Sequence, residues 1–478
     1  MRYPALKLLI DGQWIGNTTS GVLPVTNPAD GSHLGSLPIA GDAELSAALD
    51  AAARGFKVWS AMLTIDRCRI IARAVGLIRE RAASIARILT LEQGKPLAES
   101  LREVNLSADI IEFLAEESKR LASRGIPPRQ PDIISQTVQR VPVGPVAAFT
   151  PWNFPANLPA RKLGGALSAG CSVIIKPAEE TPATCMELAR AFVDAGLPPG
   201  VLNMVAGEPA AISATLIASP MIAKVSFTGS VPVGRQLGEL AARHLKRYTA
   251  ELGGHAPVIV CADVDPAVAA GLAVTAKYRN AGQICASPIR FLVQRPIYAA
   301  FREAFVAGAQ QLRIGSGLDA ETQMGPLIHE RRVQAIQGYV DDAVALGARL
   351  LCGGRRVARV GYYYEPTVLE AAPSRARAQR EEPFGPVALL DVFDEVDDAL
   401  SRANSLPYGL SAYAFTRDLA LAHRLSGGLQ AGMVGINHFG VSQPETPFGG
   451  IKDSGIGSES GLEGLLGYTD IKFVSVSA

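Results

Sequence analysis

Hydrophobic residues change their spacing along the chain, and each change predicts a different kind of structure. Residues 8–40 contain short apolar runs separated by turn residues, which predicts short strands and turns. From Asp42 to about Leu121, apolar residues recur at helical spacing, with breaks near 63–64 and at 94–96. This part of the pattern predicts three or four amphipathic helices.

From Val143 onwards, strand-like apolar runs alternate with helix-like runs. Such alternation is typical of parallel sheets with helices on both faces, so we predict two doubly wound α/β domains. The first set of strands is expected at 143–149, 172–175, 202–205, 224–228 and 248–251, with helices at 157–169, 183–195, 209–218 and 233–244. The second set has strands at 258–260, 290–293 and 387–390, a helix ending at Tyr278, and helices at 297–312 and 331–346.

Two segments differ from this alternation. Residues 124–142 contain a proline-rich crossing followed by an alternating, strand-like run at 135–142, and the tail from 468 to 477 alternates in the same way. We expect 124–142 and 461–478 to form a small β excursion used for oligomerisation, with the tail pairing with the 135–142 strand of another subunit. A surface hairpin explains the first segment equally well.

Composition narrows the classes of function. The 478 residues include 46 basic and 45 acidic side chains, giving a formal net charge of +1 and no basic surface for nucleic acid. No apolar run reaches membrane-spanning length, and residues 1–12 lack a signal-peptide core. The six cysteines show no CxxC spacing and the six histidines are dispersed, which argues against a metal site and a disulfide framework. We expect a cytoplasmic protein.

The strongest chemical candidates are a cysteine and a glutamate near the border between the two predicted domains. Cys285 lies among small and polar residues directly after a helix-like run, where a substrate can reach the thiol, although a lone cysteine is more often structural. Glu251 ends a strand-like run and precedes Leu252 and Gly253. Asn153, after the first strand of the sheet, presents an amide that can stabilise an oxyanion without adding charge.

Three further segments follow strands of the first predicted sheet. Residues 150–155 follow the first strand. Residues 176–182 follow the second strand, and their Lys and Glu side chains are suited to ribose hydroxyls. Residues 227–230 end a strand and open a helix, where free N–H groups favour a phosphate. Because ligands of doubly wound sheets sit at the carboxyl ends of the strands, these segments predict one binding site.

Seven motifs in one order connect these segments. The sequences TPWNFP (150–155), KPAEETP (176–182), FTGS (227–230), ELGG (251–254), GQIC (282–285), EEPFGPV (381–387) and PFGGIKDSGIG (447–457) together resemble the aldehyde dehydrogenase superfamily. The chain is most similar to NAD-dependent succinate-semialdehyde dehydrogenases, and the resemblance covers essentially its whole length. It implies a Rossmann-like NAD-binding domain at 1–123 and 143–253 and a catalytic domain at 254–460.

The resemblance implies a role for each motif. Cys285 matches the nucleophile, Glu251 the general base, and Asn153 with the backbone N–H of Cys285 the oxyanion donors. Glu382 matches the residue that holds the nicotinamide ribose, with Phe384 beside the ring. The full set expected at the cofactor is Thr150, Pro151, Trp152, Lys176, Pro177, Ala178, Glu179, Gly207, Gly229, Ser230, Leu252, Gly253, Glu382 and Phe384.

The cofactor and part of the substrate are also predicted. A carboxylate at Glu179 accepts hydrogen bonds from the ribose hydroxyls and repels a 2′-phosphate, so NAD is expected as the cofactor. Because Lys176 offsets part of that repulsion, we also expect weaker use of NADP. Arg161 and Arg279 occur where succinate-semialdehyde enzymes carry arginines, and two guanidinium groups suit a distal carboxylate. Phe154 and Phe448 are expected as apolar walls of this pocket, and Ser442 as a hydroxyl in it.

Several alternatives remain open at this point. Glutarate semialdehyde, 2-oxoglutarate semialdehyde or a ring-bearing semialdehyde would also place a carboxylate against Arg161 and Arg279, and an aromatic aldehyde is a further alternative. A CoA-acylating relative is one alternative, although such enzymes typically lack a carboxylate at the position of Glu251. A non-catalytic binding protein on the same fold is another, but it would be expected to lose the nucleophile or the base. A cysteine hydrolase is a third, and it needs a histidine beside the cysteine. The resemblance further implies a homodimer or homotetramer. Ser458 stands where many relatives have an arginine that supports subunit contacts.

Overall fold

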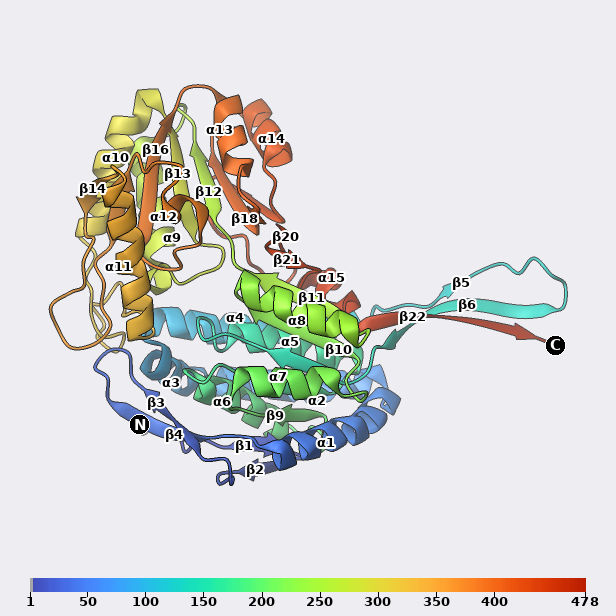
Figure 1. The fold of residues 1–478 in the computed structure, drawn as a ribbon. Coiled ribbons are helices and arrows are strands. Elements are labelled where there is room, and N and C mark those ends of the chain that lie inside the picture. Colours follow the sequence, from blue (N-terminus) through green and yellow to red (C-terminus); the bar gives the residue numbers. More distant parts are fainter. Residues whose placement is uncertain (1–2) are drawn as a thin grey trace.

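The computed structural model describes residues 3–478, which are organised around two sheets that lie one above the other in Figure 1. The first sheet has the strand order β2-β1-β9-β8-β7-β10-β11-β21. Its five central strands are parallel, and the strands at both ends of the order run antiparallel to their neighbours. The strands are β1 (Leu8–Ile10), β2 (Gln13–Ile15), β7 (Val146–Phe149), β8 (Val173–Lys176), β9 (Leu202–Met204), β10 (Lys224–Gly229), β11 (Arg247–Leu252) and β21 (Gly455–Ile456).

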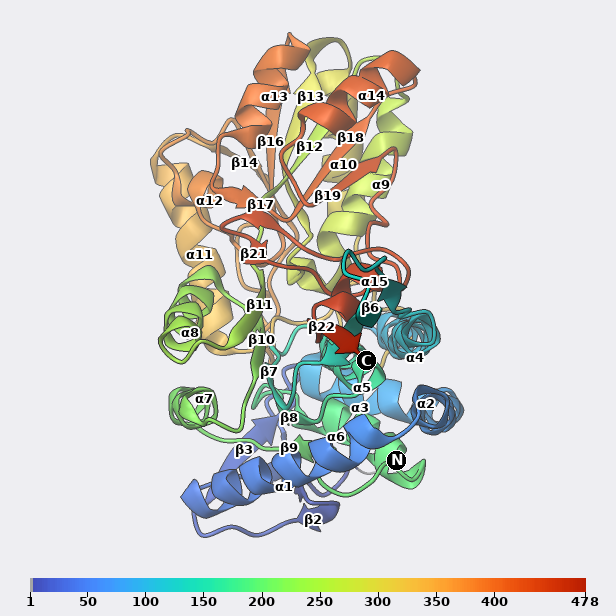
Figure 2. The same ribbon diagram turned by 90° about the vertical axis from the view of Figure 1, so that its right-hand side faces the viewer.

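Helices cover both faces of this sheet. One face carries α5 (Asn157–Ala169) and α6 (Pro182–Asp194), and the other carries α7 (Pro209–Ala218) and α8 (Val231–Arg243) (Figure 2). Four helices precede them: α1 (Asp42–Ala61), α2 (Thr64–Glu80), α3 (Ala82–Gln93) and α4 (Leu97–Ser118). The helices α2, α3 and α4 pack on α5 and α6. The hairpin of β3 (Val22–Thr26) and β4 (His33–Pro38) completes the N-terminal part.

The second sheet has the order β14-β15-β16-β13-β12-β18-β19, and only its edge strand β14 is antiparallel. Two doubly wound α/β layers are therefore present, which confirms the predicted fold class. The strands are β12 (Ala256–Val260), β13 (Pro288–Gln294), β14 (Arg349–Cys352), β15 (Thr367–Glu370), β16 (Val387–Phe393), β18 (Ser411–Phe415) and β19 (Met433–Ile436). The helices around them are α9 (Pro266–Tyr278), α10 (Arg295–Gln310), α11 (Glu330–Ala345), α12 (Arg377–Arg380), α13 (Val396–Asn404) and α14 (Leu419–Gly428).

A third, three-stranded sheet projects from the body (Figure 1). It consists of β5 (Arg124–Gly125), β6 (Ile133–Pro142) and β22 (Thr469–Ser477), with β22 paired antiparallel to β6 along its whole length. The predicted pairing of the tail with another subunit is therefore wrong: both strands belong to one chain, because the preceding segment brings β22 back beside β6. That segment is the short helix α15 (Gly461–Leu466), which lies against α4 and α5 rather than in the excursion.

The chain re-enters the first sheet near its end. The strand β21 pairs with β11, placing Gly455 opposite Glu251 and Ile456 opposite Ala250. A second short pair, β17 (Tyr408–Gly409) with β20 (Ile451–Lys452), lies just before it. Residues 455–456 thus belong to the first sheet, although the sequence predicts them within the 254–460 domain. None of the helices in residues 3–478 combines the length and apolar character needed to cross a bilayer.

Candidate active site

The order of the parallel strands in the first sheet reverses direction at β7. From β7, the chain adds β8 and β9 on one side and β10 and β11 on the other, so a crevice opens between β7 and β10 at their carboxyl ends. Thr150 follows β7 and Thr228 lies near the end of β10, and the hydroxyls of both are buried without a hydrogen-bond partner among residues 3–478. Buried orphan hydroxyls of this kind are suited to a polar ligand laid across the strand ends.

The other residues predicted at the cofactor share this edge. Gly229 is the last residue of β10, and Ser230 caps α8 without using its side chain, so the first backbone N–H groups of α8 face outward without a side-chain cap. A diphosphate favours such a helix start. The remaining members also follow strands: Pro151 and Trp152 follow β7, Pro177 and Ala178 follow β8, Gly207 follows β9, and Leu252 and Gly253 end β11 or follow it.

Lys176 and Glu179, predicted to contact the adenine ribose, form an ion pair with each other. Lys176 also donates to the carbonyl of Pro177 at 3.3 Å and is buried, whereas Glu179 is half-buried. The carboxylate is therefore held at the strand end, with its charge partly balanced by the adjacent ammonium group.

Trp152, Glu382 and Phe384 come together from both sheets. The rings of Trp152 and Phe384 meet edge to face with 5.5 Å between their centroids. The Glu382 carboxylate accepts the backbone N–H of Gly254 at 3.2 Å, and a Cβ atom at Gly253 would lie only 2.2 Å from one of its oxygens. Desolvation raises the pKa of Glu382 to about 8. Together, these residues fit a nicotinamide dinucleotide, which would supply a hydride acceptor.

Cys285 follows α9 on a loop of unusual backbone geometry. Asn280 and Ala281 have φ values of 49° and 51°, and at Gly282 an added Cβ would meet the carbonyl oxygen of Gly385 at 2.1 Å. Gln283 fixes the loop, because its amide donates to the Asn280 carbonyl at 3.1 Å and accepts the backbone N–H of Ile328 at 3.0 Å. The loop thereby holds the half-buried thiol at the wall of a cavity.

The thiol is protonated in this state of the protein. Desolvation, followed by the charges of Glu382 and Glu251, raises the pKa of Cys285 to about 12, and Arg161 acts in the opposite direction. A thiolate nucleophile therefore requires that the two carboxylates be neutral or that positive charge be added near the sulfur.

The amide of Asn153 reaches the same loop. It donates to the backbone carbonyl of Gln283 at 3.2 Å, while its own oxygen is buried without a partner. An amide nitrogen carries two N–H groups, so one donor remains for an oxyanion formed next to Cys285. The sequence prediction that Asn153 and Cys285 lie together is consistent with this geometry.

Glu251, the predicted base, is only 2% exposed, and neither of its carboxylate oxygens has a hydrogen-bond partner among the described residues. Burial and the charge of Glu459 raise its pKa well above the usual value of 4.5, whereas Lys162 and Arg161 lower it. A buried carboxylate with a raised pKa can take a proton from water at neutral pH.

The sequence analysis missed Lys162 and Glu459. Their side chains form a buried ion pair with 2.5 Å between Nζ and Oε1, and Lys162 also donates to Ser226 at 3.0 Å. Glu459 follows Ser458 in the C-terminal motif, but its partner lies 297 positions earlier. Only the return of the chain at β21 brings the two together, so no local signal could have revealed the pair.

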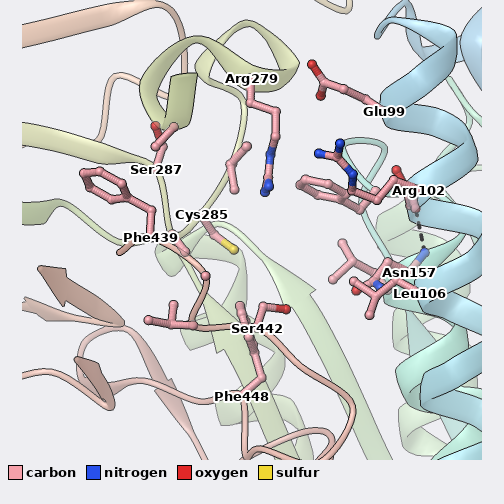
Figure 3. Close-up of a pocket in the computed structure, with 18 of the residues that line it drawn as sticks. Glu99, Arg102, Leu106, Asn157, Arg279, Cys285, Ser287, Phe439, Ser442 and Phe448 are labelled. Carbon is pink, nitrogen blue, oxygen red and sulfur yellow. Dashed lines mark hydrogen bonds between the residues drawn. The ribbon is translucent and has the colours of Figure 1, made fainter. Parts of the chain in front are cut away.

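The cavity at Cys285 lies between the two sheets and has a volume of about 1040 Å³, including its opening to solvent (Figure 3). Arg161, only 2% exposed, lines it and is held by three neutral groups: Asn157 Oδ1 at 2.9 Å, Ser460 Oγ at 2.6 Å and Ser442 Oγ at 2.7 Å. Its guanidinium also lies 4.4 Å from the centre of the Phe448 ring. No carboxylate within residues 3–478 forms an ion pair with it.

The remaining predicted substrate residues, Arg279 and Phe154, line the same cavity. The side chain of Arg279 extends into it from above Cys285 (Figure 3). The sequence did not predict several further residues that line the cavity, because none of them belongs to a recognisable motif. These residues are Lys95, Glu99, Arg102, Glu103, Leu106, Tyr413, Phe439 and Val441.

A buried ion pair supports the segment that carries Asn153 and the start of α5. Lys95 Nζ lies 2.6 Å from Glu103 Oε2 and donates to the backbone carbonyl of Asn153 at 2.8 Å. The other oxygen of Glu103 accepts the N–H groups of Ala156 and Asn157 at 2.9 and 3.2 Å, at the start of α5. This pair therefore positions Asn153 and also Asn157, which binds Arg161.

Residues 14–474 match the model described as "Aldehyde dehydrogenase family". The chain belongs to the aldehyde dehydrogenase family. It is therefore an aldehyde dehydrogenase, and enzymes of this family use NAD or NADP. No group of three or more His, Cys, Asp or Glu side chains within residues 3–478 is arranged to hold a metal ion.

Relatives of this aldehyde dehydrogenase match it over nearly their full length. It is 49% identical to 4-(hydroxymethyl)benzenesulfonate dehydrogenase TsaD1 of Comamonas testosteroni, covering 99% of this chain and 98% of that protein. It is 42% identical to the NADP-dependent succinate-semialdehyde dehydrogenase GabD of Escherichia coli, covering 98% and 97%. The crystal structure of an E. coli NADP-dependent enzyme has a TM-score of 0.97 at 41% identity, covering 100% of this chain and 98% of that one.

Proposed function

We propose that this aldehyde dehydrogenase oxidises an aldehyde with a distal anionic group, with succinate semialdehyde as the first candidate and NAD as the preferred cofactor. The observation that carries the proposal is Arg161. Its buried guanidinium lines the cavity beside Cys285 and has only neutral partners. Three of its N–H groups are used, so two of the five that a guanidinium offers remain for a carboxylate.

The chemistry proposed for the site proceeds through Cys285. Its sulfur, after losing its proton, bonds to the aldehyde carbon, and the resulting oxyanion accepts hydrogen bonds from Asn153 and the Cys285 backbone. A nicotinamide held by Trp152, Glu382 and Phe384 would accept a hydride from that carbon, so that the carbon would remain on the sulfur as a thioester. Glu251 then takes a proton from water, the hydroxide adds to the thioester carbon, and the C–S bond breaks to release the acid and free Cys285.

Support for NAD over NADP comes from Glu179. A negative charge at the end of β8 repels a 2′-phosphate and accepts hydrogen bonds from free ribose hydroxyls. The ion pair with Lys176 weakens this preference, and similar proteins include NADP-dependent enzymes, so we also propose slower turnover with NADP. We further propose a cytoplasmic enzyme that forms a homodimer or homotetramer.

A ring-bearing anionic aldehyde is the second candidate substrate. The cavity walls include Phe154, Phe439 and Phe448, which offer apolar faces to a ring. The relative at 49% identity is named for a substrate with a benzene ring and a sulfonate. Both candidates place an anion near the same arginines, and glutarate and 2-oxoglutarate semialdehydes are longer members of the first class.

The deciding experiment compares two aldehydes of equal length. Formation of NADH is followed at 340 nm with succinate semialdehyde and with butanal, for the wild type, Arg161→Ala and Arg279→Ala, with the exposed Arg87→Ala as control. We expect the wild type to prefer the semialdehyde by roughly a hundredfold in kcat/KM, which is the effect of about 2–3 kcal/mol from a charged hydrogen bond. Both cavity variants should lose that preference and the control should keep it. Equal rates with the two aldehydes would refute the anionic substrate.

A further inference from the structure

Arg102 shares the cavity with Arg279 but enters it from the opposite wall. Arg102 lies on α4, whereas Arg279 starts the loop that leads to Cys285, and Figure 3 shows both side chains directed into the same space. Both arginines are exposed, in contrast to the buried Arg161. Leu106, one helical turn after Arg102 on the same face of α4, also lines the cavity.

The charges of the lining residues do not balance. Lys95 and Glu103 neutralise each other at 2.6 Å. Glu99 accepts the backbone N–H of Asn280 at 3.1 Å and forms no ion pair with an arginine among residues 3–478. The side chains of Arg102 and Arg279 form no hydrogen bond and no ion pair with any of residues 3–478. Three guanidinium groups thus face one carboxylate. Arg161 keeps two of its five N–H groups free, and the guanidinium groups of Arg102 and Arg279 keep all of theirs free of partners among residues 3–478.

The three arginines act at two levels of the cavity. The charge of Arg161 acts on Glu251 and Cys285, at the reacting end. The charges of Arg279 and Arg102 act on Glu99, at the start of α4. The cavity therefore offers a cationic group close to the nucleophile and a second cationic group of two arginines nearer to solvent.

We propose that Arg102, together with Arg279, forms an outer anion subsite that binds the far end of a ring-bearing aldehyde. This inference rests on the proposed function and names the substrate class: a benzaldehyde with an anionic group, sulfonate or carboxylate, opposite the aldehyde. The ring lies against the apolar side chains of Leu106, Phe154 and Phe439, and its anion accepts hydrogen bonds from both guanidinium groups. A four-carbon semialdehyde is held by Arg161 and Arg279 and does not reach Arg102.

The test compares substrates that differ in anion and in length. The value of kcat/KM with NAD is measured for 4-sulfobenzaldehyde, 4-carboxybenzaldehyde, benzaldehyde and succinate semialdehyde. The variants are Arg102→Met, Arg102→Lys and the control Arg87→Met, an exposed arginine on α3 that does not line the cavity. Thermal unfolding of each variant establishes that it is folded.

We expect Arg102→Met to lose about 10- to 100-fold in kcat/KM with the charged benzaldehydes, mainly through KM, and to stay within about twofold of wild type with benzaldehyde and succinate semialdehyde. Arg102→Lys should recover part of the loss. A larger effect with 4-sulfobenzaldehyde identifies sulfonate as the preferred anion, and a larger effect with 4-carboxybenzaldehyde identifies carboxylate.

Two outcomes overturn the inference. An equal loss with all four substrates would make Arg102 a structural residue, and no loss with either charged benzaldehyde would exclude it from the substrate. If the wild type prefers succinate semialdehyde over butanal while Arg102→Met behaves like wild type, only the outer subsite fails. If the wild type shows no preference for any anionic aldehyde, the proposed function itself fails.

Discussion

Glu251 and Cys285 are close enough to influence each other's protonation. The Glu251 charge raises the pKa of the thiol, and burial together with Glu459 raises the pKa of Glu251 itself. The thiol is protonated at neutral pH, and the raised pKa of Glu251 disfavours a second anion in the same buried space. Each becomes reactive only when its proton is removed.

Replacing Glu251 by Gln separates the two halves of the reaction. We expect a first turnover that releases about one NADH per enzyme, because Cys285 is intact, followed by a steady state reduced by about 10²–10⁴-fold, because thioester hydrolysis lacks its base. Rapid-mixing absorbance at 340 nm measures both phases. In the wild type, hydrolysis should accelerate as pH rises through the raised pKa of Glu251. An unchanged steady state in the variant would exclude Glu251 as the base.

The pKa of Cys285 depends on Glu382. Replacing Glu382 by Gln removes a negative charge that acts on the sulfur above the Glu382 pKa of about 8, so the pKa of the thiol should fall from about 12 and alkylation should begin at lower pH. The rate of iodoacetamide alkylation as a function of pH measures this shift. The exposed Glu321→Gln serves as control and should leave the profile unchanged. A profile that stays in place, or moves to higher pH, would contradict the electrostatic effect.

The choice between NAD and NADP depends on the side chain of Glu179. Replacing Glu179 by Ser removes the charge that faces a 2′-phosphate and leaves Lys176 unpaired. The ratio of kcat/KM for NADP to that for NAD should rise by about tenfold or more, since like charges about 4 Å apart repel by roughly 1–4 kcal/mol near a protein surface. Steady-state kinetics with both cofactors measure the ratio. An unchanged ratio would locate the discrimination elsewhere.

At the scale of elements, the sequence predicted most of the fold because strand and helix periods differ clearly. The bounds of α5 and α7 agree with the expected ranges to the residue. The break between α2 and α3 at Arg81 was missed, because apolar residues keep their helical spacing across it. Long-range contacts could not be predicted from the pattern. Nothing local links Lys162 to Glu459, and the alternation in β22 does not show whether its partner, the 135–142 strand, belongs to the same chain.

The start of α5 depends on Glu103 of α4. Replacing Glu103 by Gln keeps an oxygen for the N–H groups of Ala156 and Asn157 but leaves the buried Lys95 without a counter-charge. We expect a loss of about 3–5 kcal/mol in the free energy of unfolding. A lower kcat should follow, because Lys95 holds the Asn153 carbonyl.

Urea unfolding and steady-state kinetics of the same preparation measure both effects. The control is Glu116→Gln on the same helix, where the carboxylate is half-exposed and pairs with Lys119. That change should cost less than about 1 kcal/mol. Similar losses in the two variants would show that the Lys95–Glu103 pair has no special role.

At the scale of the whole molecule, the projecting sheet of β5, β6 and β22 is the clearest surface for assembly. Its strand β22 is an edge strand, and Ile134, Ile471, Phe473 and Val476 are exposed large apolar residues on it and on β6. Exposed edges and apolar side chains invite pairing, and a sheet with so little core of its own gains stability from a partner.

Replacing both Ile471 and Phe473 by Asp should therefore lower the molar mass measured by light scattering after gel filtration. Charges would have to be buried in an assembled interface, whereas the β6–β22 ladder inside one chain remains. The exposed Lys472→Gln between them is the control and should leave the mass unchanged. A double variant with the wild-type mass would exclude this sheet from the interface.

The pairing of β21 with β11 completes the first sheet with residues that are synthesised after every strand of the second sheet. Until Gly455 and Ile456 emerge, the outer edge of β11 lies open, and Lys162 has no Glu459 to balance its charge in the core. The first sheet therefore cannot be completed before the strands of the second sheet have been synthesised, although every other strand of the first sheet is already present by then. A premature stop just before residue 455 would leave both sheets nearly complete and still produce a chain with an unpaired edge, which is a substrate for chaperones and proteases.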